Sequence, residues 1–307
     1  MKKVLVATDK PFAKEAVDGI QAKAKEAGYE VILLEKYGTK ENLLKAVADV
    51  DAMIIRSDIA DKDVIEAGKN LKIIVRAGAG FDNIDLNAAT ACNVVAMNTP
   101  GQNSNAVAEL VISMMIMIAR NNFNGKSGSE INGKKLGIYG YGNVGRILGK
   151  YAMAFNMEVI AYDPFLTKEQ IEATGAKQCT NLDELFGTCH YISLHCPANN
   201  ETKNSINMGK MGIMPKGATL INTARKEVIN EEDLKKVFEQ RPDFKYVADV
   251  APDCAAELKE KYADRVFFTP KKLGAQTEEA NINAGLAAIS QIVDYFENGN
   301  ERFRLNK

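Results

Sequence analysis

The sequence has no tryptophan, only two histidines and five cysteines in 307 residues. The cysteines are odd in number and show no C-x-x-C spacing: Cys92, Cys179, Cys189, Cys196 and Cys254. This pattern favours free thiols in a reducing compartment over a disulfide framework or a zinc site. We therefore expect a cytoplasmic protein without a metal site.

Charge of one sign and long hydrophobic runs are also lacking. The formal net charge is -1, which argues against a globally basic surface for nucleic acid. The most apolar stretch, Leu110–Ala119, is far shorter than the roughly 20 residues that a membrane-spanning helix needs. The apolar start Met1–Val6 is soon followed by Asp9 and Lys10, so we interpret it as a strand rather than a signal peptide. We expect a small molecule as the partner, and neither nucleic acid nor membrane.

The sequence does contain a regular alternation of short apolar runs and helical segments, in a chain long enough for two domains. In the first third, runs of strand length lie at 4–8, 30–35, 52–56, 71–77 and 93–98. Apolar runs separated by helices are typical of a parallel sheet with both faces covered.

A break at Asn98–Gly101 precedes an apolar helix predicted from about Asn105 to Arg120. Its all-round hydrophobicity favours burial between two domains over a methionine-rich binding surface. Residues 121–133, rich in Asn, Gly and Ser, are expected to form a linker. Further strands are predicted near 136–139, 158–162, 191–195, 219–222, 246–250 and 266–268, with a last helix at about 278–298. The expected fold class is α/β, with two doubly wound parallel-sheet domains.

A glycine-rich segment, Gly140-Tyr141-Gly142-Asn143-Val144-Gly145, follows directly after a predicted strand and leads into a predicted helix. This context makes the G-x-G-x-x-G pattern typical of a dinucleotide site. Gly140 permits the tight turn, Gly142 lets the backbone approach a pyrophosphate, and Gly145 lets helix and strand pack closely. The free N–H groups and the dipole of the helix N-terminus favour the anion.

Asp163 ends the next predicted strand, at roughly the 20-residue distance expected for the ribose-binding acid. Its carboxylate can accept hydrogen bonds from ribose hydroxyls and would repel a 2′-phosphate. The sequence therefore predicts NAD rather than NADP as the cofactor. The alternative is that Asp163 is only a turn residue before Pro164.

Beyond the glycine loop, four segments resemble those of the D-2-hydroxyacid dehydrogenase family. They are Arg76–Asp85 (RAGAGFDNID), Asn98–Ser104 with the following Ala108–Leu110, Asn222–Arg225 (NTAR) and Ala248–Val250 (ADV). The resemblance implies a flavodoxin-like substrate-binding domain made of residues 1–98 and 277–307. An NAD-binding Rossmann domain of residues 99–276 would be inserted into it, with the active site in the cleft. It also implies a homodimer through the NAD-binding domains.

The resemblance assigns roles to individual residues. Asn143 and Val144 would offer backbone N–H groups to the pyrophosphate. Arg225 would bind the substrate carboxylate and polarise the carbonyl of the keto acid, a surface ion pair being the alternative. Further cofactor contacts are implied for Ala79, His195, Cys196, Pro197, Thr223, Asp249 and Gly274. Substrate contacts are expected of Arg56, Ser57, Arg76 and Gly78, although both of these arginines could instead be structural.

Two positions depart from the family's pattern. Cys254, preceded by Asp253, stands where the family has a catalytic glutamate. The segment Pro270–Thr277 lacks the family's catalytic histidine and contains one additional residue. Counting back from the glycine of this segment aligns Lys272 with the missing histidine, whereas counting forward from its proline aligns Lys271.

The two departures are consistent with a lysine as the catalytic base. A free lysine has a pKa near 10.4, and a neighbouring carboxylate would raise that pKa further. Loss of the glutamate, burial of the lysine and the charge of Arg225 would all favour the unprotonated amine. We predict that Lys272, or else Lys271, removes the hydroxyl proton while hydride leaves the adjacent carbon. The alternatives are an exposed lysine pair that only attracts an anionic substrate, or His195 as the base.

Within the family, the first two segments resemble members acting on 3-phosphoglycerate more than those acting on lactate or glyoxylate. We therefore expect NAD-dependent oxidation of 3-phosphoglycerate to 3-phosphohydroxypyruvate, the first step of phosphorylated serine biosynthesis, without feedback through a C-terminal regulatory domain. The alternatives are a dehydrogenase of glyoxylate, hydroxypyruvate or another 2-hydroxy acid, or a non-catalytic NAD-sensing protein of the corepressor type.

Overall fold

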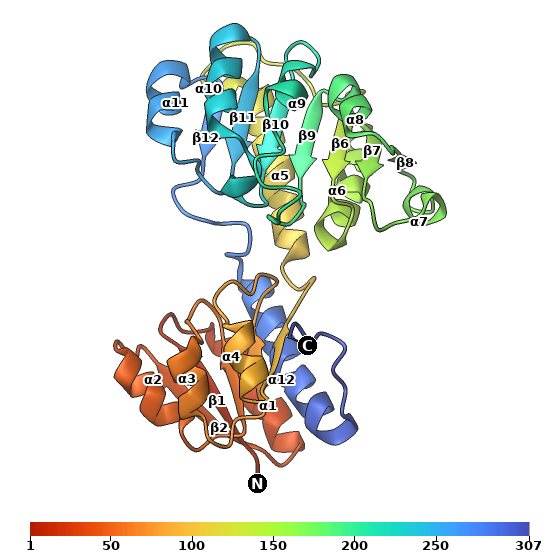
Figure 1. Ribbon diagram of the computed structural model, residues 1–307. Helices are drawn as coiled ribbons and strands as arrows, with labels where there is room; N and C mark the ends of the chain where they lie inside the picture. The colour runs from red at the N-terminus through yellow and green to blue at the C-terminus, as the bar shows by residue number, and fades with distance from the viewer. Residues whose placement is uncertain (307) are drawn as a thin grey trace. The chain divides into compact units, whose positions relative to one another are not determined.

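The computed structural model describes residues 1–306, which form two compact units (Figure 1). Unit 1 consists of Met1–Asn103 together with the residues from Gln276 onward, and unit 2 consists of Ser104–Ala275. Each unit is a parallel sheet flanked by helices, so the predicted α/β class with two doubly wound sheets is confirmed.

Unit 1 contains a five-stranded parallel sheet with the order β2-β1-β3-β4-β5, which is the flavodoxin-like order. Its strands are β1 (Lys3–Thr8), β2 (Glu30–Glu35), β3 (Ala52–Ile55), β4 (Ile73–Arg76) and β5 (Val95–Asn98). Its helices are α1 (Lys14–Glu26), α2 (Lys40–Val47), α3 (Lys62–Ala67), α4 (Leu86–Ala91) and α12 (Glu278–Asn298).

Helices from opposite ends of the sequence cover one face of this sheet. α1 and α12 pack against each other and bury Ile20 and Ile289 against strand residues such as Val6. Helices α2, α3 and α4 pack on the residues of the other face. The Thr277 hydroxyl accepts a hydrogen bond from the Ala280 N–H at 3.2 Å and so caps the start of α12. The final helix therefore completes the core of the N-terminal unit.

Unit 2 contains a seven-stranded parallel sheet with the order β12-β11-β10-β9-β6-β7-β8. Its strands are β6 (Lys135–Tyr139), β7 (Glu158–Tyr162), β8 (Lys177–Gln178), β9 (Tyr191–Leu194), β10 (Thr219–Asn222), β11 (Lys245–Ala248) and β12 (Val266–Phe268). Its helices are α5 (Ser104–Ala119), α6 (Asn143–Ala154), α7 (Lys168–Glu172), α8 (Leu182–Thr188), α9 (Met208–Gly212), α10 (Glu231–Gln240) and α11 (Ala255–Tyr262), with short 3-10 turns η1 (Asn121–Phe123) and η2 (Lys226–Val228). The strand order reverses between β6 and β9, where open α/β sheets bind ligands at their carboxyl edge.

The structure shows how α5 packs within its unit and corrects one expectation about elements. Helix α5 buries Val111, Met115 and Ile118 in a core cluster of its own unit, together with residues of the sheet and of α6. Packing within unit 2 therefore accounts for these apolar residues of α5. The short edge strand β8 was missed, because two residues of partly exposed backbone pairing leave no apolar run in the sequence.

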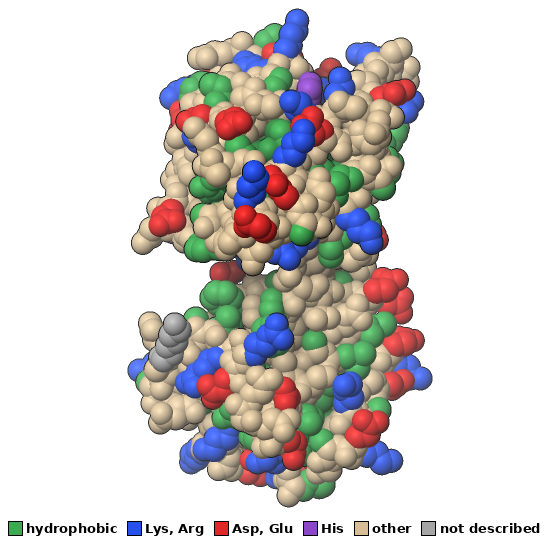
Figure 2. Space-filling model, turned by 90° about the vertical axis from the view of Figure 1, so that its right-hand side faces the viewer, with side chains coloured by type: hydrophobic (Ala, Val, Ile, Leu, Met, Phe, Trp, Pro, Cys, Tyr) green, Lys and Arg blue, Asp and Glu red, His purple; other side chains and the backbone are tan. Residues whose placement is uncertain are grey.

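The surface mixes charges of both signs. On the face shown in Figure 2, acidic and basic side chains are interspersed rather than gathered by sign. Within residues 1–306, no helix has the length and apolar character needed to cross a membrane. The five cysteines, all among these residues, are free thiols.

Candidate dinucleotide and substrate site

The glycine loop connects β6 to α6 at the switch point of the unit 2 sheet. Gly140 has a φ of 93°, which favours glycine. A Cβ at this position would lie 2.9 Å from the backbone carbon of His195. The tight turn after β6 therefore needs glycine both for its conformation and for its close approach to the chain leaving β9.

The other two glycines of the loop differ in what surrounds them. A Cβ at Gly145 would lie only 2.5 Å from the carbonyl oxygen of Gly140, so helix and loop pack too closely for a side chain. A Cβ at Gly142 would meet no protein atom within 4 Å among the described residues. Protein packing therefore does not explain glycine at 142, whereas a close ligand does. Because Asn143 and Val144 begin α6, their N–H groups are free for an anion, and the loop fits the pyrophosphate of NAD.

Asp163 lies just past the end of β7 and its carboxylate faces the glycine loop. One oxygen accepts a hydrogen bond from the Tyr141 N–H at 2.8 Å, and the other accepts one from the Phe165 N–H at 2.9 Å. Asp163 thus forms the turn that the sequence left as an alternative and also fixes the loop. Each carboxylate oxygen can accept a further hydrogen bond, so the ribose role remains open to the same group.

His195 follows β9, and both of its ring nitrogens face hydroxyl groups. Nε2 lies 2.9 Å from Ser193 Oγ, and Nδ1 lies 3.5 Å from Thr223 Oγ1. Burial lowers the pKa of His195 to about 4, so the ring is neutral near pH 7. A neutral ring with so low a pKa is a weak proton acceptor, which counts against His195 as the base. The adjacent Cys196 is buried, and burial raises the pKa of its thiol to about 12.

Arg225 lies in a turn that a buried asparagine holds. Asn222, at the end of β10, donates a hydrogen bond to the Arg225 carbonyl at 2.9 Å and accepts one from the Ala224 N–H at 3.0 Å. Arg225 Nη1 in turn donates to the Ala224 carbonyl at 3.0 Å. The N-T-A-R segment therefore fixes the backbone that carries the guanidinium at the carboxyl edge of the sheet.

The predicted base residues lie on an exposed loop. Lys271 and Lys272 are both exposed, in the stretch between β12 and Gly274. The expected burial of the lysine is therefore not found in the described structure. Asp249 is buried, 1% exposed, and its carboxylate accepts hydrogen bonds from the Leu273 and Gly274 N–H groups that end this loop.

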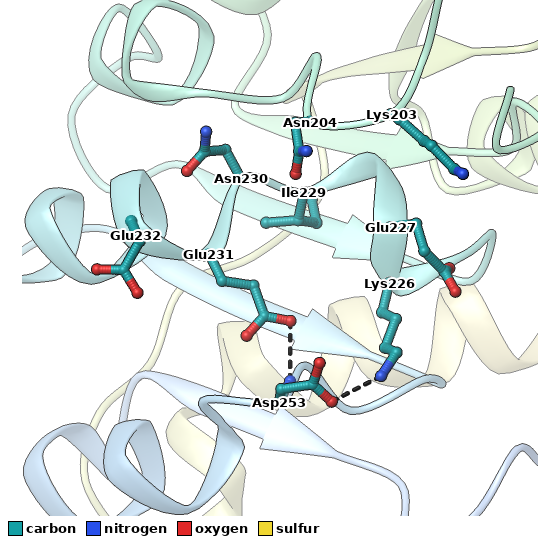
Figure 3. Close-up of a pocket in the computed structure, with 9 residues that line it drawn as sticks. All are labelled: Lys203, Asn204, Lys226, Glu227, Ile229, Asn230, Glu231, Glu232 and Asp253. Atoms are coloured by element: carbon teal, nitrogen blue, oxygen red, sulfur yellow. Dashed lines mark hydrogen bonds and ion pairs between the residues drawn. The ribbon is translucent and has the colours of Figure 1, made fainter. Parts of the chain in front are cut away.

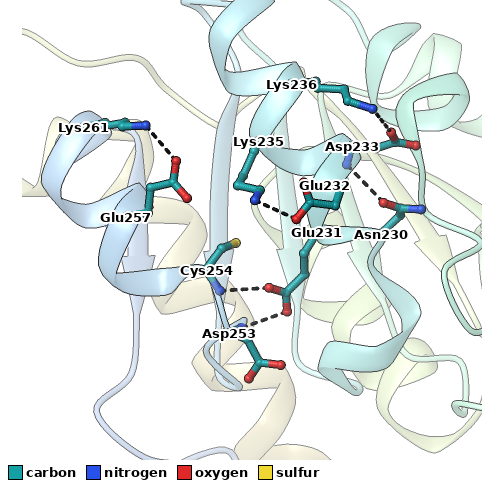
Figure 4. Close-up of polar contacts among 10 residues, drawn as sticks. All are labelled: Asn230, Glu231, Glu232, Asp233, Lys235, Lys236, Asp253, Cys254, Glu257 and Lys261. Atoms are coloured by element: carbon teal, nitrogen blue, oxygen red, sulfur yellow. Dashed lines mark hydrogen bonds and ion pairs between the residues drawn. The ribbon is translucent and has the colours of Figure 1, made fainter.

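The region that replaces the family's glutamate contains a different carboxylate. Glu231, the first residue of α10, accepts hydrogen bonds from the backbone N–H groups of Asp253 at 2.8 Å and Cys254 at 2.9 Å (Figure 4). Burial, together with the Glu231 carboxylate, raises the pKa of the Cys254 thiol to about 12. Lys226 forms an ion pair with Asp253 at 2.6 Å. The carboxylates of Glu231 and Asp253 are thus both engaged in local contacts. The sequence did not predict the role of Glu231, because only tertiary packing brings it to this turn.

A cavity of about 460 Å³ opens beside this region at the carboxyl edge of unit 2 (Figure 3). It is lined by residues that follow β9, β10 and β11: Lys203, Asn204, Lys226, Glu227, Ile229, Asn230, Glu231, Glu232 and Asp253. These are not the residues predicted for the cofactor or substrate. The cavity is therefore a neighbour of the predicted site and does not define it.

In unit 1, the two arginines predicted to bind substrate, Arg56 and Arg76, have different contacts. Arg56 donates from Nη1 to the carbonyls of Lys10 at 3.3 Å and Pro11 at 2.9 Å, and from Nη2 to the Asn281 side chain of α12. These bonds commit the guanidinium to joining three segments of the unit, which favours the structural alternative for Arg56. Ser57 beside it is exposed.

Arg76 lies directly over the loop that follows β4. A Cβ at Gly78 would lie 1.7 Å from Arg76 Nη1, so only glycine fits beneath the guanidinium. Gly78 also has a φ of 149° and donates its N–H to Thr99 Oγ1 at 2.7 Å. The neighbouring Ala79 carbonyl accepts a hydrogen bond from Asn98 at 2.6 Å. The predicted residues Arg76, Gly78 and Ala79 are therefore brought together at the carboxyl edge of this sheet.

A Rossmann sheet, a glycine loop that leaves room for a pyrophosphate and an acidic residue after the next strand define an NAD-dependent oxidoreductase. The chain belongs to the D-isomer specific 2-hydroxyacid dehydrogenase family, whose NAD binding domain model matches residues 86–270. It is therefore an NAD-dependent dehydrogenase that acts on the CH–OH group of a 2-hydroxy acid, as the sequence predicted.

Relatives within the family differ in name and in length. The chain is 35% identical to the hydroxypyruvate reductase of Thermotoga maritima, over 95% of this chain and 98% of that protein. It is 36% identical to the D-3-phosphoglycerate dehydrogenase of Methanocaldococcus jannaschii over 83% of this chain, and the match spans only 51% of that relative. The NAD+-bound 3-phosphoglycerate dehydrogenase of Entamoeba histolytica is 46% identical, with a TM-score of 0.90 and coverage of 100% of this chain and 99% of that one.

Proposed function

We propose that this dehydrogenase oxidises 3-phosphoglycerate to 3-phosphohydroxypyruvate in the cytoplasm, as a step toward serine. The observation that carries the proposal is the likeness over the full chain to the Entamoeba histolytica 3-phosphoglycerate dehydrogenase, at 46% identity. Arg76, which lies over Gly78 at the carboxyl edge of unit 1 and donates from Nε to the Arg56 carbonyl at 3.0 Å, supports it as a guanidinium that suits an anionic substrate.

In the proposed oxidation, a few side chains bind the substrate and move its proton. The glycine loop would hold NAD+, which would supply the hydride acceptor for the carbon that bears the hydroxyl. Arg225 binds the substrate carboxylate through two parallel hydrogen bonds and stabilises negative charge that develops on the reacting oxygen. The Lys272 amine, or else that of Lys271, takes the hydroxyl proton as the C–O bond becomes a carbonyl. Asp163 orients the loop and accepts hydrogen bonds from the adenosine ribose.

The substrate is tested by following NADH oxidation with four keto acids in parallel: 3-phosphohydroxypyruvate, hydroxypyruvate, glyoxylate and pyruvate. We expect the phosphorylated acid to have the highest kcat/KM, since its phosphate offers an additional anion for the arginines. The second candidate is hydroxypyruvate reduction, which the match to nearly the full length of the Thermotoga maritima relative supports. Faster turnover of unphosphorylated hydroxypyruvate would establish that candidate, and NADH binding without turnover of any acid would indicate a non-catalytic NAD sensor.

The proposed base is tested with Lys272→Ala and Lys271→Ala. We expect the variant at the true base to lose about 100-fold or more in kcat, the usual contribution of general acid–base catalysis. Lys216→Ala is a matched control, because Lys216 is an exposed lysine of the same unit with no proposed role. If both loop variants turned over at the wild-type rate, the lysines would serve at most to attract the substrate.

We also propose that the chain forms a homodimer through unit 2, whose surface exposes the large apolar side chains of Phe123 and Phe155. Sedimentation of the wild-type chain checks the dimer. A monomer at micromolar concentration would contradict it.

A further inference from the structure

Asp249 is a buried carboxylate whose hydrogen bonds converge from both ends of one loop. It lies just past the end of β11 and is 1% exposed. Oδ1 accepts a hydrogen bond from the Leu273 N–H at 2.7 Å, and Oδ2 accepts one from the Gly274 N–H at 2.8 Å. At the other end of the loop, Thr269 Oγ1 lies 3.0 Å from Oδ1 and 2.8 Å from the Asp249 carbonyl oxygen.

The residues between these anchors are Pro270, Lys271 and Lys272, which we call the lysine loop. Because Thr269 and Leu273 bind the same carboxylate group, the start and the end of the lysine loop are held beside one side chain. The two lysines between them are exposed. The backbone on both sides of the two lysines is therefore held in place.

Close packing reinforces this arrangement. A Cβ at Gly274 would lie 2.9 Å from Asp249 Oδ2 and 3.2 Å from Val107 Cγ2 of α5, so the chain after the loop comes as near to the carboxylate as glycine allows. Asp249 is itself anchored, since its N–H donates to the Asn222 carbonyl at 3.0 Å. Among the described residues, the donors to its carboxylate are neutral groups, so removing the carboxylate leaves no buried cation behind.

We propose that Asp249 is a positioning residue whose carboxylate holds both ends of the lysine loop and so sets where the lysine amines can reach. This inference rests on the proposed role of a loop lysine as the base. It differs from the family-based expectation that Asp249 acts at the nicotinamide, because it assigns the effect of Asp249 to the loop.

The test is Asp249→Asn, which keeps the size of the side chain but replaces one acceptor oxygen with an N–H donor. We expect kcat to fall roughly 10- to 100-fold, as misplacement of a reacting group does, while KM for the hydroxy acid stays within about threefold. We also expect trypsin to cleave after Lys271 and Lys272 about tenfold faster, because the loop opens more often. Asp264→Asn, an exposed aspartate of the same unit, is the matched control for both measurements.

Substitutions of the loop anchor keep the test decisive if Asp249→Asn folds poorly. Thr269→Val removes the hydroxyl and should show the same pattern more weakly, whereas Thr269→Ser retains it and should restore wild-type kcat and cleavage. A wild-type cleavage rate, or a loss of NADH affinity with kcat intact, would overturn the proposal. The rate of trypsin cleavage reports on the loop and does not depend on which residue is the base. The kcat values of Lys271→Ala and Lys272→Ala test the base separately, so failure of the lysine mechanism can be distinguished from failure of this proposal.

Discussion

At the scale of single residues, the chain after β9 shows how burial decides the chemistry of a side chain. The family resemblance predicts that His195 lies at a turn beside the cofactor, but it does not predict the protonation state of the ring. The structure sets its ring between Ser193 and Thr223, and burial lowers its pKa to about 4. The same histidine is therefore available as a neutral hydrogen-bonding group over the whole range from weakly acidic to alkaline pH.

This pKa predicts a contribution to stability that depends on pH. The pKa of His195 is near 6.5 in the unfolded chain and about 4 in the folded chain. Between these two pH values the ring is protonated in the unfolded chain but neutral in the folded chain. The contribution of His195 to the free energy of unfolding is therefore fully present above pH 6.5. It decreases by up to about 3 kcal/mol as the pH falls to 4. Urea unfolding of the wild type and His195→Gln at pH 7 and pH 4.5 checks it. The variant should lose less stability on acidification, and equal losses would contradict the assignment.

The exposed lysines lead to a second prediction at this scale. An amine base acts only when unprotonated, and a free lysine has a pKa near 10.4 against about 6.5 for histidine. Lys272→His should move the midpoint of the pH–kcat profile to lower pH. An unchanged midpoint would mean that another group titrates.

At the scale of elements, the strand–loop–helix unit of β6 and α6 separates glycines that packing requires from glycines that a ligand requires. The sequence pattern predicted both roles, since the order of the glycines fixes which of them faces the helix and which faces the phosphates. The surroundings in the structure agree with that division: a Cβ at Gly145 would be crowded by Gly140, and a Cβ at Gly142 would meet no protein atom within 4 Å among the residues described.

Gly145→Ala and Gly142→Ala should therefore fail in different ways. The Cβ at 145 would overlap the Gly140 carbonyl, so we expect a loss of about 1–3 kcal/mol in the free energy of unfolding. The Cβ at 142 should leave thermal stability near the wild-type value but weaken NADH binding roughly tenfold or more, because the pyrophosphate loses its close backbone contacts. Thermal unfolding and NADH fluorescence titration separate the two effects. Equal loss of stability in both variants would contradict this division of roles.

At the scale of the whole molecule, unit 1 is assembled from both ends of the chain. Beyond α12, the last described residue, Asn306, is 3% exposed and lies beside the edge strand β5. Its side chain accepts a hydrogen bond from the Ala96 N–H at 2.8 Å and donates to the Val94 carbonyl at 2.9 Å. No feature of the local sequence Arg304-Leu305-Asn306 signals this pairing, because its partners lie some two hundred residues earlier.

Asn306→Ala should lower the free energy of unfolding by about 1–3 kcal/mol, since it leaves two buried backbone groups without their partner. NADH affinity should be unchanged, because these bonds lie within unit 1 and the glycine loop lies in unit 2. Asn298→Ala, which removes an exposed asparagine near the end of α12, is the control and should change stability by less than about 0.5 kcal/mol. A fall in NADH affinity for Asn306→Ala would show that the units are coupled through this contact.

The sequence by itself determined the features that depend on local pattern. Alternating apolar runs gave the order of strands and helices, and the glycine spacing gave the cofactor loop, because both follow from backbone geometry over a few residues. Tertiary structure alone decided what depends on residues distant in the chain: Arg56 joins three segments, Glu231 binds the turn at Cys254, and Asp249 holds the lysine loop. Each of these side chains is polar and could have served a ligand. Only the position of its partners shows that its hydrogen bonds are made within the protein.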